Sequence, residues 1–331
     1  MSDAKIRRSR RILEMNLEDV PGTSAGAAKF DVADAVAGFC GTLAIFANPS
    51  RLDLSNPAVA RFDEDFGGSY VPLFGDRVIV EGSPEYLSAS PAVDHTFGAT
   101  AVLVYRLGIV PRRAAWTQQL RLAEIAATAD GTFNTPDPSP YLTRDERFLA
   151  VTFESHSGVW GHDPSGDGSA DNGTYAFGSR PDMVAGDAST SELLEDFFTP
   201  HHTFEAEIDP GFSGNFDLFF RENVAHSNRS QYLERVTLTG NNTAEIFGSI
   251  GDDVLTGNAG NNNLNGRSGD DILDGGPGLD SAIFAAPRSE FTIIDNGDGT
   301  TTVRHDVASG LGTDLLSNIA ILVFNDQNVS I

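Results

Sequence analysis

Between residues 239 and 283, one large aliphatic side chain recurs every nine residues among glycine, asparagine and aspartate. Five consecutive units follow the pattern G-G-x-G-x-D-x-U-x, where U is a large aliphatic residue: TGNNTAEIF, GSIGDDVLT, GNAGNNNLN, GRSGDDILD and GGPGLDSAI. In the first four units, the aliphatic position holds Ile246, Leu255, Leu264 and Leu273. A disordered Gly/Asn linker does not keep such a period. The pattern therefore predicts a tight turn and a short strand in every unit.

Each position of the unit has a physical role. Glycines at the first and fourth positions let the backbone take positive φ, so that the chain turns tightly and points carbonyl oxygens inward. The sixth position supplies a carboxylate or amide oxygen, and a ligand set made only of oxygens favours calcium over zinc or magnesium. The predicted metal-binding residues are Gly248, Gly251, Asp253, Gly257, Gly260, Asn262, Gly266, Gly269, Asp271, Gly275, Gly278 and Asp280.

These units resemble the RTX, or haemolysin-type calcium-binding, family. The resemblance covers residues 239–283 strongly and 284–331 moderately, and it implies a parallel right-handed β-roll in which loops 18 residues apart share an ion. Pairing such loops joins Asp253 to Asp271 and Asn262 to Asp280, which predicts about two calcium ions. A third pair, Ala244 with Asn262, is doubtful because Ala244 stands where the carboxylate belongs.

Short apolar or alternating runs recur before the repeats, separated by glycine, proline and aspartate. In the clearest run, Phe204, Ala206 and Ile208 would share one strand face, with Glu205 and Glu207 on the other. Long amphipathic helices are not evident, so residues 31–237 are predicted to form a β-sandwich or jelly roll and the fold class is mainly β. The predicted strands are residues 42–47, 71–74, 77–81, 100–107, 115–123, 148–155, 174–177, 203–208, 216–221 and 232–238.

Three further segments complete the predicted organisation of the chain. Residues 31–40 read as a short helix, and so do residues 190–198, with Thr190 or Ser191 as the N-cap. Residues 1–30 are predicted to be a mobile arm. The β-rich domain, residues 31–237, is followed by the β-roll, residues 238–283, and by a cap, residues 284–331.

The segment after the repeats predicts a hairpin and a β cap. Residues 291–294 and 300–303 would be joined by the turn Asn-Gly-Asp-Gly, and the sequence GTDLLSNIAILVFND follows. An open coil exposes a sheet edge and the end of an apolar core, so a cap must cover both. Resemblance to RTX proteins implies that this region also carries the export signal.

Composition and charge limit the classes of partner that this protein is expected to bind. The formal net charge is −25, with 47 acidic against 22 basic residues, which disfavours nucleic acid and favours cations. Cys40 is alone, and no run of 18 apolar residues predicts a membrane span. The N-terminal segment lacks the apolar core of a Sec signal. We therefore expect a secreted, extracellular bacterial protein exported by type I secretion machinery, as the resemblance implies.

The N-terminal domain carries weaker candidate chemistry. Asp163, Ser165, Asp167 and Asp171 fall at positions 1, 3, 5 and 9 of an EF-type calcium loop, but Thr174 stands where the bidentate glutamate belongs. The alternative is a polar hairpin loop. No H-E-x-x-H zinc motif occurs.

Two functions remain open for this domain. One is binding of a glycan or cell-surface ligand, with Trp160 as a candidate for stacking on sugar rings. The other is a polysaccharide-cleaving hydrolase or lyase, for which Glu154, His156, Glu205 and Glu207 are the candidate catalytic residues if neighbouring strands bring them together. Solvated polar strand faces carry the same residue types, so the pattern does not decide whether the protein is an enzyme.

Overall fold

The computed structural model describes residues 2–39, 41–46, 70–86, 94–135, 141–160, 168–171, 173–218, 232–307 and 310–331. The chain divides into two compact units. The first, here called the helical unit, comprises residues 1–79 and 90–200, and the second, the coil unit, comprises residues 80–89 and 201–331. The unit that contains the repeats therefore also includes residues 80–89 and 201–237, which the sequence predicts to belong to the N-terminal domain.

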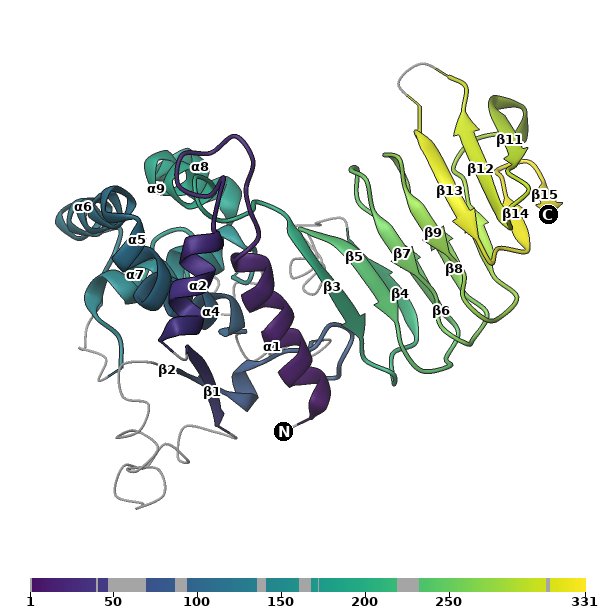
Figure 1. The fold of residues 1–331 in the computed structure, drawn as a ribbon. Coiled ribbons are helices and arrows are strands. Elements are labelled where there is room, and N and C mark those ends of the chain that lie inside the picture. The colour runs from purple at the N-terminus through teal and green to yellow at the C-terminus, as the bar shows by residue number, and fades with distance from the viewer. Residues whose placement is uncertain are drawn as a thin grey trace. The chain divides into compact units, whose positions relative to one another are not determined.

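The helical unit is built around one buried helix, α4 (Thr96–Val104). Every residue of α4 is buried, and the helix contacts α1, α2, α7 and both strands of a small parallel sheet (Figure 1). A π-helical turn (Tyr105–Ile109) continues it into α5. The other elements are α1 (Asp3–Asn16), α2 (Phe30–Gly38), β1 (Thr42–Phe46), β2 (Tyr70–Phe74), a 3-10 turn (Gly75–Arg77), α5 (Val110–Arg112), α6 (Ala114–Asp130), α7 (Arg144–His156), α8 (Arg180–Gly186) and α9 (Ala188–Glu195).

The predicted β-sandwich is wrong for residues 94–200, whose described elements are helices. The strands predicted at residues 100–107, 115–123 and 148–155 lie in α4 with the π-helical turn, in α6 and in α7. Short apolar runs in a strand and in a fully buried helix look alike, because neither shows a polar face. Residues 174–177 form isolated bridges only, and residues 77–81 form no strand.

Several local predictions in the helical unit are confirmed, and others need correction. The strands at residues 42–47 and 71–74 correspond to β1 and β2, and the helix at residues 31–40 corresponds to α2. The helix near residue 190 is α9, but Asp187 caps it, by accepting from the Thr190 N–H at 3.3 Å. Residues 3–16 of the expected arm form α1, in which Ile12 and Met15 are buried.

The coil unit alternates between two sheets of mostly parallel strands, as Figure 1 shows. One sheet has the order β11-β12-β13-β9-β7-β5-β3 and the other the order β15-β14-β10-β8-β6-β4. Because β3 and β4 already pair in parallel with β5 and β6, the coil starts before the repeats. The strands are β3 (His202–Ile208), β4 (Gly214–Asp217), β5 (Leu233–Leu238), β6 (Ala244–Phe247), β7 (Val254–Thr256), β8 (Asn263–Asn265), β9 (Ile272–Asp274), β10 (Ser281–Ile283), β11 (Phe291–Asp295), β12 (Thr300–His305), β13 (Thr313–Ser317), β14 (Ile321–Val323) and β15 (Asn328–Ser330).

The aliphatic side chain of each repeat lies in the core of the coil. Ile246, Leu255, Leu264 and Leu273 are all fully buried. In register, Leu255 lies opposite Leu273, and Ile246 lies opposite Leu264. The period of nine therefore places one apolar residue of each short strand between the two sheets.

The predicted C-terminal hairpin is confirmed. Strands β11 and β12 pair antiparallel, and the Asn296 N–H donates to the Thr300 carbonyl at 3.1 Å. At the C-terminal end of the coil, the first sheet ends in β11 and β12 and the second sheet ends in β15. These three strands pair antiparallel with their neighbours. No helix in the described part of the chain is long and apolar enough to cross a bilayer.

Candidate functional site

Stacking of the repeat turns brings two of the sixth-position aspartates, Asp253 and Asp271, together on one edge of the coil. The backbone N–H of Asp253 donates to Asp271 Oδ1 at 2.8 Å. In the same way, the backbone N–H of Asp271 donates to Asp314 Oδ1 at 3.1 Å. Asp253, Asp271 and Asp314, here called the aspartate column, are all nearly inaccessible to solvent. The pairing of Asp253 with Asp271 matches the spacing of 18, whereas Asp314 lies 43 residues after Asp271.

Asp314 was not among the predicted site residues. It lies in the sequence GTDLLSN, which the repeat pattern does not reach, and strand β13 places it because it pairs in parallel with β9. A signal was present, since Gly312, Thr313 and Asp314 repeat the spacing of a glycine two residues before the sixth-position aspartate. The Thr313 N–H also donates to Asp270 Oδ1 at 2.8 Å, as the Asp270 N–H does to Asp252 Oδ1.

The opposite edge holds the second predicted pair. The backbone N–H of Asn262 donates to Asp280 Oδ1 at 2.6 Å. In the doubtful third pair, side-chain amides donate to the carbonyls of the opening loop. Asn262 Nδ2 donates to the Ala244 carbonyl at 3.5 Å. Asn258 Nδ2 donates to the carbonyls of Thr239 and Asn242, both at 3.1 Å. Carbonyl oxygens that a cation would bind in a complete loop are therefore hydrogen-bonded to a neutral side chain here.

The first-position glycines lie against the sixth-position side chains of their own loops. A Cβ atom at Gly248 would lie 2.6 Å from Asp253 Oδ2 and 2.5 Å from the carbonyl oxygen of Gly266 in the neighbouring turn. A Cβ at Gly266 would collide with Asp271 in the same manner. Gly269, at the fourth position, has φ of +119°, a conformation that favours glycine. A side chain at these positions would therefore displace either an aspartate or a carbonyl oxygen.

Burial perturbs the carboxyl groups of the aspartate column. It raises the pKa of Asp253 to about 7 and that of Asp314 to about 8, and the negative charge of Asp271 adds to both shifts. Burial also raises the pKa of Asp271 to about 6 and, on the opposite edge, the pKa of Asp280. Ionised carboxylates packed in this way require a compensating positive charge.

The loops fit a calcium ion. Oδ2 of Asp271 and Oδ2 of Asp280 are buried without a hydrogen-bond partner. Backbone carbonyls of neighbouring turns also lie near these loops, that of Gly266 beside Gly248 and Asp253 Oδ2, and that of Gly260 beside Gly278 and Asp280 Oδ2. Within the described residues, no group of three or more His, Cys, Asp or Glu side chains forms a metal cluster. The donor set thus combines one or two carboxylates with backbone carbonyls, which suits a hard cation such as calcium.

The predicted EF-type loop is only partly within the described residues. Asp163, Ser165 and Asp167 lie outside them. Asp171 has φ of +46° and receives a hydrogen bond from Arg147 at 3.2 Å. A second calcium site in this loop therefore stays a prediction.

The predicted catalytic residues are divided between the two units, Glu154 and His156 in the helical unit and Glu205 and Glu207 in the coil unit. Glu154 and His156 lie on helix α7 and not on a strand, so a step of two residues places their side chains more than half a helical turn apart. His156 instead contacts Glu195, with Nε2 and Oε1 3.0 Å apart. Glu205 and Glu207 belong to β3 of the coil unit, where Glu205 receives a hydrogen bond from Thr237 Oγ1 at 2.7 Å. The prediction that neighbouring strands bring these four residues together is therefore wrong for Glu154 and His156, which lie on no strand.

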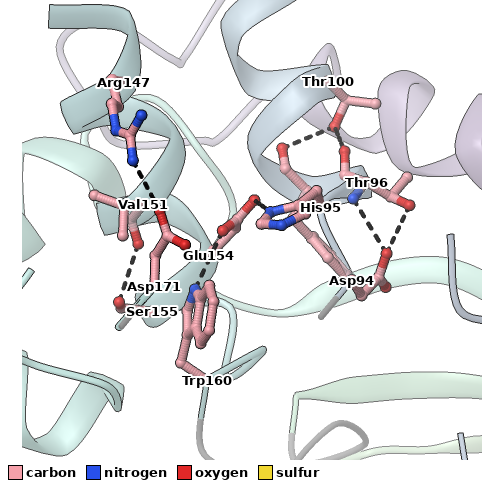
Figure 2. Close-up of polar contacts among 11 residues, drawn as sticks. Asp94, His95, Thr96, Thr100, Arg147, Val151, Glu154, Ser155, Trp160 and Asp171 are labelled. Atoms are coloured by element: carbon pink, nitrogen blue, oxygen red, sulfur yellow. Dashed lines mark hydrogen bonds and ion pairs between the residues drawn. The ribbon is translucent and has the colours of Figure 1, made fainter. Parts of the chain in front are cut away.

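Glu154 lies in a different polar cluster, which Figure 2 shows. Its Oε1 is 3.0 Å from Nδ1 of His95, and its Oε2 accepts from Nε1 of Trp160 at 3.1 Å. His95 was not predicted, because it lies 59 residues away in sequence and no motif connects the two. Trp160 and Trp116 are both buried, so neither ring forms a surface for stacking on sugars.

Comparison with known protein families finds one match, in the repeat segment. Residues 247–282 match the model of the RTX calcium-binding nonapeptide repeat, in four copies. The matched segment runs through the loops of Asp253, Asn262, Asp271 and Asp280, and it leaves the helical unit without a family. A search of curated proteins gives no match to the chain.

Proposed function

We propose that the coil unit binds calcium through its repeat loops and that calcium completes its fold. The observation that carries this proposal is the pair of buried oxygens without a hydrogen-bond partner, Oδ2 of Asp271 and Oδ2 of Asp280. Leaving a buried carboxylate oxygen without a partner is costly. A bound calcium ion would remove that cost, and its binding free energy would become folding free energy.

Two ions are proposed for the repeats, one on each edge of the coil. The first would be held by the loops of residues 248–253 and 266–271, which supply Asp253 and Asp271. The second would be held by the loops of residues 257–262 and 275–280, which supply Asn262 and Asp280. The amide contacts of Asn258 and Asn262 support leaving the opening loop, residues 239–244, without an ion.

We further propose that the protein leaves the cell unfolded, through a type I secretion route, and folds outside. Inside the cell calcium is too scarce to offset repulsion among the loop carboxylates, whereas extracellular modules bind it at roughly 10⁻⁴ to 10⁻³ M. The RTX repeats and the net charge of −25 support this proposal. The coil would then act as an export and folding device for the helical unit, with the export signal in residues 284–331.

Hydrogen exchange of the full chain, with calcium and with EDTA, tests the calcium proposal. We expect peptides covering residues 248–283 to be protected with calcium and to exchange quickly in EDTA, since the loops then lose their bridging charge. Peptides from α4 and α7 lie in the helical unit, so they show whether the loss of protection in EDTA is confined to the coil unit. Equal protection of the repeats in both conditions would refute calcium-dependent folding.

The secretion proposal needs a separate test. The full chain and a variant truncated after residue 283 can be expressed with and without a type I secretion apparatus. We expect the full chain in the medium only when the apparatus is present, and the truncated chain inside the cell. Apparatus-independent release of the full chain would contradict the proposed route.

A further inference from the structure

The helical unit contains a cavity of about 200 Å³ between β2, α4 and α7. Most of its wall is aliphatic: Val71 and Leu73 of β2, Val102 of α4, and Leu142 just before α7. Val71, Leu73 and Val102 also belong to a cluster of buried hydrophobic residues in this unit. The apolar wall is therefore fixed by the core and does not depend on an exposed loop.

The polar end of the cavity is formed by Glu154 and His95. Glu154 is nearly inaccessible to solvent, and its two oxygens contact the His95 and Trp160 rings on either side (Figure 2). Gly98 of α4 makes this approach possible, because a Cβ at that position would collide with Glu154 Oε1. His95 keeps about a third of its side chain exposed while Glu154 does not, so the imidazole and not the carboxylate is open to a ligand.

Among the described residues around this end of the cavity, the charged side chains are paired except for one arginine. Asp94 pairs with Arg8 at 2.7 Å, Asp171 pairs with Arg147 at 3.2 Å, and Glu154 pairs with His95. Burial lowers the pKa of His95, but the charge and hydrogen bond of Glu154 outweigh it, so that the pKa of His95 is raised, while burial also raises the pKa of Glu154. Arg77 also lines the cavity, and among the described residues no carboxylate pairs with it.

We propose that this cavity binds a small apolar carboxylate, with its hydrocarbon part against the aliphatic wall and its carboxylate at Arg77 and His95. An apolar cavity of about 150 Å³ accommodates benzene, so the observed volume suits a single ring or a short chain with one carboxylate. Arginine is suited to such an anion because its planar guanidinium can bind both oxygens. A cation would meet Arg77 instead of a free carboxylate, since Glu154 is engaged by His95 and Trp160.

Calorimetric titration of the full, calcium-loaded protein with three matched probes tests the proposal. The probes are benzoate, benzyl alcohol and benzylamine, which share a ring and differ in charge. We expect benzoate to bind at least tenfold more tightly than either of the other two. Preference for benzylamine, equal affinity for all three probes, or no binding at millimolar concentration would each overturn the proposal.

Two variants locate the site. Arg77→Gln is expected to weaken benzoate binding at least tenfold and to change benzyl alcohol binding less than twofold, because only the anion contact is lost. Arg112→Gln removes an exposed arginine of the same unit and should leave both affinities unchanged. If Arg77→Gln binds benzoate like the unmodified protein, the ligand lies elsewhere and the proposal fails. A circular dichroism spectrum unchanged from the unmodified protein confirms that each variant folds.

Discussion

The backbone N–H of Asp253 donates to Oδ1 of Asp271, 18 residues later in the chain, at a distance of 2.8 Å. The second carboxylate oxygen of Asp271 is buried and has no partner. Asp271 thus joins two turns of the coil through one oxygen and leaves the other for a cation. This makes Asp271 the residue of the repeats on which calcium binding should depend most.

We expect Asp271→Ala to raise the calcium concentration at the midpoint of folding by about tenfold or more, because a charged ligand is lost. Asn262→Ala should raise it by about twofold, since a neutral oxygen contributes less. Calcium titration monitored by circular dichroism measures both. Asp34→Ala, which removes an exposed charge from α2, is the control for net charge and should leave the midpoint unchanged. The reverse order of the two repeat variants would refute the proposed pairing.

Asp314 should matter although it lies outside the repeats. Its Oδ1 accepts from the Asp271 backbone N–H, just as Oδ1 of Asp271 accepts from the Asp253 backbone N–H. We expect Asp314→Asn to weaken calcium binding by about tenfold, because the last carboxylate of the column is lost. Asp326→Asn is the matched control, since Asp326 is exposed and only receives the Arg288 backbone N–H. If both variants weaken calcium binding to a similar extent, the effect comes from a general change in the cap and not from Asp314.

The sequence predicted the coil better than the helical unit for a physical reason. Each repeat carries its turn residues, its core residue and its ligand within nine positions, so local spacing fixes the aspartate pairs. Asp314 joins the column only through the pairing of β13 with β9, which the period of nine does not contain.

In the helical unit, the sequence contains local signals for the ends of helices, but the prediction of strands followed the apolar pattern instead. Thr143 and Glu146 form a capping box that marks the start of α7, and Gly131 with φ of +83° ends α6. The apolar runs after these signals look the same in a strand and in a buried helix. The contact of Glu154 with His95 depends on the packing of α4 against α7, which no sequence spacing reveals.

Asn258 should stabilise the opening turn of the coil without binding an ion. Its side-chain amide donates to the Thr239 and Asn242 carbonyls, and it is almost completely buried. We expect Asn258→Ala to lower the free energy of unfolding by about 2 kcal/mol, because two carbonyls lose their donor. Urea unfolding with saturating calcium measures this loss, and Asn325→Ala, an exposed control, should change stability little. Calcium stoichiometry from calorimetry should stay the same, and a lost ion would contradict the assigned role.

The stability of the calcium-free coil should fall as the pH rises. Burial raises the pKa of Asp271 to about 6, of Asp253 to about 7 and of Asp314 to about 8, whereas the ordinary value of an aspartate is 3.8. Between about pH 4 and pH 8 the folded coil therefore holds protons that the unfolded chain has released, and a state that binds more protons loses stability as pH rises. Each carboxyl contributes up to about 1.4 kcal/mol per pH unit in this window.

Calcium should reverse this dependence, because it replaces the protons of the aspartate column. We expect hydrogen exchange of residues 248–283 in EDTA to be slower at pH 5 than at pH 8 after correction for intrinsic rates, and calcium affinity to rise over the same interval. Calorimetry at pH 6.5 in two buffers of different ionisation enthalpy should detect proton release on calcium binding. The variant Asp271→Asn should release fewer protons. Calcium affinity that is constant from pH 5 to pH 8 would show that these carboxyl groups do not bind the ion.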